Sequence, residues 1–100
     1  KAISYIEQNY FRELQQKEVA GLLYIHPQYL SRLFKKELGV TFGEYLNRFR
    51  IEKAKELLLQ TNMPIYVVAT ECGFTDAAYF CKKFHQIMAT TPLRYRKNAL

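Results

Sequence analysis

The chain has 100 residues, 49% of them hydrophobic, with only four glycines and three prolines, so intrinsic disorder and collagen-like repeats are excluded. Fifteen lysine and arginine residues against nine acidic residues give a net charge of +6, which favours an acidic partner. No apolar run approaches the roughly 20 residues of a membrane span, and the two cysteines lack the spacing of a redox or zinc motif, so we expect a cytoplasmic domain with free thiols.

Apolar residues at helical spacing predict three helices over residues 1–40. The first two are short, and their apolar residues are Ile3, Ile6 and Tyr10, then residues 19–23. Pro27 suits the first turn of the third helix, and Gly39 supplies its left-handed end. The apolar stripe of this third helix is Leu30, Leu33, Phe34 and Leu38. Its opposite, polar face carries Gln28, Ser31, Arg32, Lys35 and Lys36.

A long helix is predicted over residues 41–61, because Thr41 and Glu44 have the spacing of a capping box. Its apolar positions are Phe42, Tyr45, Leu46, Phe49, Ala54, Leu57 and Leu58. The residues that we assign to the core with most weight are Leu57, Leu58, Phe34, Phe84 and the small hydrophobe Cys72.

Three more helices are predicted in the rest of the chain. Pro64 suits the first position of a fifth helix, which Gly73 ends. Thr75 is the expected N-cap of the sixth, and Thr91 followed by Pro92 predicts a short seventh. In the sixth helix, Phe80, Phe84, Ile87 and Met88 are expected to face inward, and the outward positions are Ala78, Tyr79, Lys82 and Gln86. No strand signal remains, so the predicted fold class is all-α.

The pattern of residues occurs twice along the chain. The matching pairs are 19–20 with 68–69, 25–26 with 74–75, 29–34 with 79–84, and Gly39, Thr41 and Tyr45 with Ala89, Thr91 and Tyr95. Two copies are too few for a solenoid. The repeat therefore predicts two helix-turn-helix units, over residues 1–40 and 62–100, joined by the linker helix 41–61.

Each unit has the layout of a DNA-reading helix-turn-helix, a short helix followed by a helix with a polar, cationic outer face. A connecting helix of about 20 residues spans about 30 Å. Successive major grooves open on one face of DNA about 34 Å apart, so one chain can place two reading helices in adjacent grooves.

The outer faces carry side chains suited to base edges and phosphates. Arg32 can donate two hydrogen bonds to guanine, Gln28 can pair with adenine, and Ser31 can donate or accept. The second unit offers fewer hydrogen-bonding groups for base edges, on Ala78, Tyr79 and Lys82. We therefore expect most base discrimination in the first unit. The expected phosphate contacts are Lys35, Lys36 and Lys83, with Thr41, Thr75 and Thr91 at helix N-termini.

Four motifs are spread between residues 29 and 96: YLSRLFKKELG over residues 29–39, FGEYLNRFR over 42–50, VAxxxGFxD over 68–76 and TPxxYR over 91–96. Together they resemble the DNA-binding domain of the AraC/XylS family of bacterial transcription regulators. The resemblance implies that the third and sixth helices read successive major grooves of double-stranded DNA. By position, the family's base-contacting residues fall on Gln28, Ser31, Arg32, Ala78, Tyr79 and Lys82. It also implies a sensor, dimerisation or receiver domain outside this fragment, RNA polymerase as a further partner, and a place at the nucleoid.

Three places depart from the family pattern. Tyr24 stands where the family usually has glycine, and forcing a bulky residue to positive φ costs about 1 kcal/mol. Ala89 replaces a second glycine at a helix end. Gln15 and Gln16 stand where the family favours a capping Ser or Thr and a buried leucine, so the start of the second helix is expected to differ.

Other functions fit parts of the sequence. The same basic faces would suit a protein-interaction module with an acidic partner, although Gln28, Ser31 and Arg32 offer little apolar anchor area. Cys81 would suit thiol transfer if the surrounding cationic helix lowered its pKa. Cys81 and His85 would make half of a zinc site, but no second pair of ligands has the right spacing. We therefore expect no catalytic residue, no cofactor and no metal.

Overall fold

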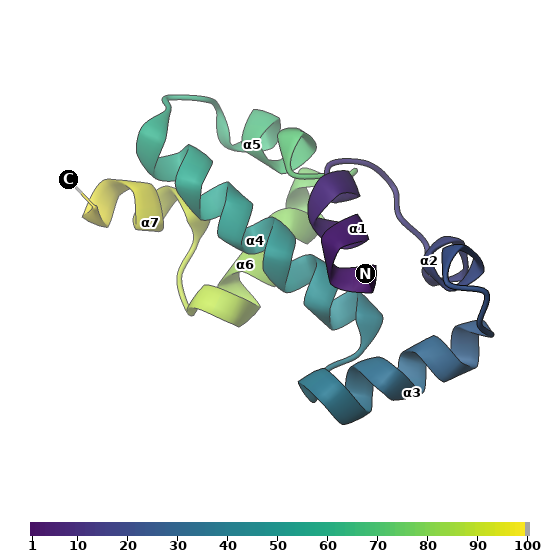
Figure 1. Cartoon of the computed structure of the whole chain (residues 1–100). Coiled ribbons are helices and arrows are strands. Elements are labelled where there is room, and N and C mark those ends of the chain that lie inside the picture. The colour runs from purple at the N-terminus through teal and green to yellow at the C-terminus, as the bar shows by residue number, and fades with distance from the viewer. Residues whose placement is uncertain (100) are drawn as a thin grey trace.

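The computed structural model describes residues 1–99, which form seven α-helices and no strand, as the sequence predicts (Figure 1). The helices are α1 (Ala2–Asn9), α2 (Gln16–Leu22), α3 (Pro27–Leu38), α4 (Phe42–Gln60), α5 (Ile65–Glu71), α6 (Ala77–Met88) and α7 (Pro92–Asn98). None of them is long and apolar enough to cross a membrane.

Two small hydrophobic cores share α4. The first core contains Ile6, Leu14, Val19, Ala20, Leu30, Phe34, Phe42 and Leu46. The second contains Ile51, Ala54, Leu58, Val68, Ala69, Cys72, Phe74, Phe80 and Phe84. The first core therefore joins α1 to α3 with the first half of α4, and the second joins α5 and α6 with its second half. Helices α3, α5, α6 and α7 pack closely on α4, whereas α2 packs on α3 (Figure 1). The molecule is elongated as a result, with principal extents of 45 × 22 × 20 Å.

Most helix ends follow the local signals in the sequence. Thr41 and Glu44 form the predicted capping box, in which Thr41 Oγ1 accepts from the Glu44 amide at 3.1 Å and Glu44 Oε1 accepts from the Thr41 amide at 2.8 Å. Thr91 caps α7 by accepting from the Arg94 amide at 3.2 Å, with Pro92 in the first turn. Gly39 ends α3 with a φ of 75°.

The prediction that Thr75 caps α6 is wrong. Asp76 is the N-cap, and its carboxylate accepts a hydrogen bond from the Ala78 amide at 2.8 Å. The reason is that the second turn is longer than the first: His26 directly follows Ile25 and caps α3, whereas Thr75 stands between Phe74 and the cap. The two copies of the repeat therefore differ by one residue in the turns before α3 and α6.

Three further expectations need correction at helix ends. Pro64 is the N-cap of α5, and the first helical residue is Ile65. Leu38 and Ile87 were expected to face the core but are 40% and 37% exposed. Both lie in the last turn of their helix, whereas the buried residues of α3 and α6, which are Leu30, Phe34, Phe80 and Phe84, lie in earlier turns.

The departures from the family pattern have the predicted backbone consequence. Tyr24 has a φ of 58° and Ala89 a φ of 60°, which are left-handed values that favour glycine. Such a residue follows the helix before each of α3 and α6, Tyr24 after α2 and Gly73 after α5, and α3 and α6 themselves end on one, Gly39 and Ala89. The N-cap residue of α2 makes no side-chain capping bond, as is also the case at the starts of α1 and α5.

Candidate nucleic-acid interface

The outer face of α3 is polar and open to solvent. Leu30 and Phe34 are buried on the inner side of the helix, and this orientation exposes Gln28 and Arg32 on successive turns of the outer side. Lys35 and Lys36 continue the exposed face, and Ser31 is half-buried at its edge. The imidazole of His26 accepts from the Gln28 amide at 3.1 Å, which fixes the first turn of the helix. The prediction that this face of α3 lies outward is therefore confirmed.

The outer face of α6 carries fewer hydrogen-bonding groups. Ala78 and Lys82 are exposed, and Tyr79 is 43% exposed. Lys83 is half-buried, with its ammonium 5.5 Å from the centre of the Tyr79 ring and 3.3 Å from the Gln86 amide oxygen. The outer face of α6 therefore offers the Lys82 ammonium, the Tyr79 phenol and the Ala78 methyl group.

Tyr79 is tied to the linker helix. Its hydroxyl oxygen accepts a hydrogen bond from Asn47 Nδ2 at 3.3 Å, and its ring lies 6.2 Å from the ring of Phe74. A phenol that accepts one bond keeps its own O–H as a donor. Sequence reasoning missed Asn47 because it is a polar residue of the linker, separated by 32 positions from its partner.

Cationic side chains of α3 and α6 lie near the first turns of α4. The pKa of the Glu44 carboxyl is lowered by the hydrogen bond from the Thr41 amide and further by the nearby positive charges of Lys35 and Arg48. Glu44 and Arg48 also line a hollow between α4 and α6 together with Lys83. Lys35 of α3 and Lys83 of α6 are thus linked through one stretch of α4.

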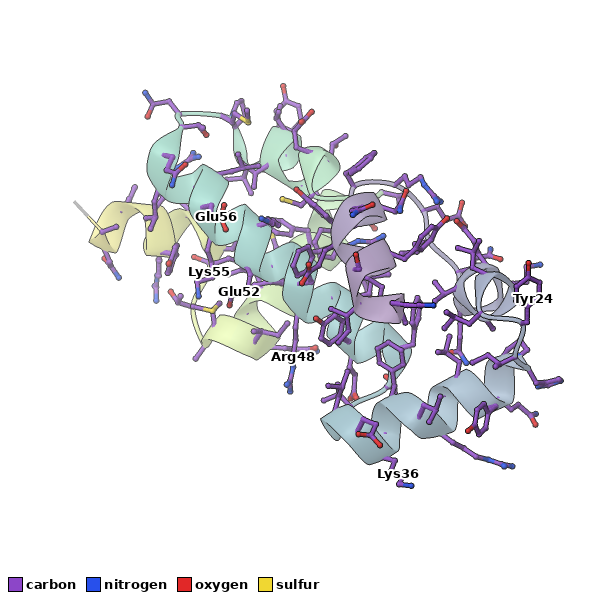
Figure 2. All side chains as sticks on the ribbon, in the orientation of Figure 1. Tyr24, Lys36, Arg48, Glu52, Lys55 and Glu56 are labelled. Carbon is purple, nitrogen blue, oxygen red and sulfur yellow. The ribbon has the colours of Figure 1, made fainter. Side chains whose placement is uncertain are left out.

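Arg48 is a further cation, to which the sequence motifs assign no role. Its side chain is exposed and points away from α4 (Figure 2). Figure 2 also shows Lys36 projecting from α3 toward the same edge of the molecule. Arg48 therefore adds positive charge between the two outer faces.

The threonines at helix N-termini differ in what their hydroxyls do. Those of Thr41 and Thr91 accept capping hydrogen bonds. Thr75 is exposed in the turn before α6 and does not cap that helix. The three exposed threonines therefore flank the starts of α4, α6 and α7, where backbone amides point outward.

The cysteines do not have the environment that thiol transfer needs. Burial raises the pKa of the Cys81 thiol, contrary to the expectation that the cationic helix would lower it. Burial, as the largest cause, raises the pKa of Cys72 to about 12. Within residues 1–99, no three His, Cys, Asp or Glu side chains gather into a possible metal site.

Comparisons with known proteins agree with this architecture. The family described as a helix-turn-helix domain matches residues 19–98. The uncharacterized HTH-type transcriptional regulator YijO of Escherichia coli (strain K12) is 42% identical over 93 residues, which are 93% of this chain and 33% of YijO. The chain thus spans about a third of the length of that relative.

Solved structures extend the likeness to three dimensions. The C-terminal domain of AraT, a response regulator from Geobacillus stearothermophilus, superposes with a TM-score of 0.92 at 39% identity, covering 97% of this chain and 81% of that one. The DNA-binding domain of AdpA, a global transcriptional factor solved in complex with a target DNA, gives a TM-score of 0.92 at 20% identity, covering 97% and 87%. At that lower identity the likeness shows the fold alone.

Proposed function

Since this chain belongs to the AraC-type helix-turn-helix family, we propose that it binds double-stranded DNA sequence-specifically, as the output domain of a bacterial transcription regulator. The observation that carries the proposal is the pair of exposed, polar and cationic helix faces on α3 and α6, which belong to two units that pack around separate cores on the two halves of α4. The 19 residues of α4 span about 28 Å at 1.5 Å per residue, which supports binding of the two faces in successive major grooves.

The roles of the side chains follow from their chemistry. In the first unit, Arg32 reads guanine, Gln28 reads adenine, and Ser31 supports them from the edge of the face. In the second unit, Lys82 and Tyr79 supply mainly phosphate contact and register, and Ala78 touches at most a thymine methyl. The proposed phosphate contacts are Lys35, Lys36, Lys83, Thr41, Thr75 and Thr91.

The division into a first unit over residues 1–40, a linker over 41–61 and a second unit over 62–100 is part of the same proposal. It is supported by the two separate cores. In the full-length regulator, a sensor, dimerisation or receiver domain and RNA polymerase would be the further partners, and the bound protein would lie at the nucleoid.

The test begins with a selection on random DNA duplexes to find the preferred site. Binding of Arg32→Ala and Lys35→Ala is then measured on the selected duplex and on a random one. We expect Arg32→Ala to lose about 1 to 3 kcal/mol on the selected duplex only, because it removes a contact to a base edge. Lys35→Ala should weaken both duplexes alike and reduce the salt dependence, because it removes a phosphate contact.

Lys55→Ala is the charge-matched control, since Lys55 is already paired with Glu52 at 3.1 Å. It should change neither affinity appreciably. Equal losses on both duplexes for Arg32→Ala would remove that residue from base reading. A selection that enriches no sequence would refute specific DNA binding altogether.

A further inference from the structure

Arg50 lies in the middle of α4, between the two cores, and its side chain is directed into the protein. The residue is only 9% exposed. Its Nε donates to the carbonyl oxygen of Tyr10 and its Nη2 to the carbonyl oxygen of Arg12, both at 2.8 Å. Both acceptors belong to the segment between α1 and α2, so these bonds tie the linker helix to the first unit.

The same guanidinium contacts the turn of the second unit. Its carbon lies 5.7 Å from the centre of the Phe74 ring, which is buried in the second core. The neighbouring Gly73 has a φ of 95°, and a Cβ atom there would overlap the Tyr10 carbonyl and lie 2.8 Å from Arg50 Nε. Glycine is therefore needed for close approach as well as for the backbone angle.

These five residues, Tyr10, Arg12, Arg50, Gly73 and Phe74, form what we call the Arg50 junction. It is the place where backbone of the first unit, side chain of the linker and backbone of the second unit meet.

The junction is connected to α2 in the first unit and to α6 in the second. On one side, the guanidinium of Arg12 pairs with Glu18 of α2 at 2.5 Å, and the hydroxyl of Tyr5 on α1 also donates to Glu18. On the other side, Phe74 contacts Tyr79 in the first turn of α6. A continuous set of contacts therefore runs from α2 through Arg50 to α6.

We propose that Arg50 is a positioning residue that fixes the relation between the two reading helices and thereby sets the spacing of the two half-sites that this domain accepts. The inference rests on the proposed DNA-binding function. Each unit packs on its own half of α4 through a separate core. The junction adds a direct connection between the units, because Arg50 donates hydrogen bonds to backbone of the first unit and lies against the Phe74 ring of the second.

The test varies the spacing between the half-sites of the selected duplex by inserting or deleting one base pair. Affinities of the 100-residue chain and of Arg50→Met are measured on the three duplexes and on each half-site alone. We expect the unaltered chain to lose roughly tenfold or more on either changed spacing, comparable with a mismatched base pair. Arg50→Met should bind the original spacing more weakly, differ little among the three spacings, and bind each single half-site as the unaltered chain does.

Arg96→Met is the matched control. Arg96 also donates to two backbone carbonyls, those of Leu58 at 2.9 Å and Met63 at 2.7 Å, but these lie in the second half of the chain. Arg96→Met should therefore lower the melting temperature and keep the steep dependence on spacing. If it flattens that dependence as Arg50→Met does, the effect is general destabilisation and the proposal is overturned.

Arg50→Lys covers the case in which Arg50→Met fails to fold. It keeps the charge, but a single ammonium cannot reproduce the planar pair of donors, so its dependence on spacing should be intermediate. A dependence on spacing as steep as that of the unaltered chain, in whichever of the two variants folds, overturns the assignment of Arg50. If the selection enriches no sequence at all, the proposed DNA-binding function itself fails and this inference fails with it. If it enriches a site for the first unit alone, specific DNA binding stands and the proposed control of half-site spacing is overturned.

Discussion

Replacing Gly73 with alanine is expected to destabilise the domain more than any other glycine-to-alanine change in the chain. Two effects add at this position. A φ of 95° is unfavourable for an L-residue, which costs about 1 to 2 kcal/mol. The new Cβ would also overlap the Tyr10 carbonyl and displace the bond from Arg50, and a hydrogen bond to a charged group contributes about 1.5 to 3 kcal/mol. The expected loss is therefore about 3 to 5 kcal/mol.

Other glycines separate the two effects. Gly39 has a φ of 75° but no atom within 4 Å of a built Cβ, so Gly39→Ala should show the backbone cost alone, about 1 to 2 kcal/mol. Gly43 lies in α4 with ordinary backbone and open space, so Gly43→Ala should stabilise by about 0.5 to 1 kcal/mol. Tyr24→Gly is the reverse change at the equivalent turn of the first unit. It should stabilise by up to about 1 kcal/mol, since the Tyr24 side chain is 95% exposed and extends into solvent (Figure 2).

The assay is equilibrium unfolding in urea, followed by far-ultraviolet circular dichroism, with the free energy of unfolding extrapolated to water. The free energy of unfolding of a domain of this size is about 5 to 15 kcal/mol, so Gly73→Ala keeps a measurable transition when the unaltered chain lies above the lower end of that range. The reasoning about close approach would be refuted if Gly73→Ala cost no more than Gly39→Ala. In that case the backbone angle would account for the whole effect.

Two other predictions follow from single contacts. Asp76→Ala should lower the free energy of unfolding by about 1 kcal/mol in the same urea assay, because the N-cap of α6 is lost. Thr75→Ala is the control and should change it little. A larger loss for Thr75→Ala than for Asp76→Ala would show that Thr75 is the N-cap. The pKa of Glu18 is lowered from 4.5 to about 2, first by the hydrogen bond from Arg12 and then by that from Tyr5. A lowered pKa means that the stabilisation is present above pH 4.5 and disappears as the pH falls toward 2. The stability advantage over Glu18→Gln should shrink over that range, and a constant advantage would contradict the assignment.

The structural features that could be predicted from the sequence depend on residues that lie within a few positions of one another. The capping box of Thr41 and Glu44, the stop at Gly39 and the Thr91–Pro92 start are made by atoms within one helical turn, so their residue types and spacing were enough. The outward position of Gln28 and Arg32 was equally determined, because the buried stripe on the other side of α3 orients the helix.

Other features were decided only when distant segments came together. The partners of Arg50 are backbone carbonyls 40 and 38 positions away. Every residue has the same backbone carbonyl, so a sequence pattern cannot show which carbonyls accept these bonds. Asn47 meets Tyr79 across 32 positions, and this pair too depends on how α6 packs against α4. The exposure of Leu38 and Ile87 depended on how α3 and α6 pack in the folded protein, since helical periodicity alone continues into the last turn of each helix. Local chemistry thus determined the helices and their outer faces, whereas tertiary packing decided how the two units are fastened to each other.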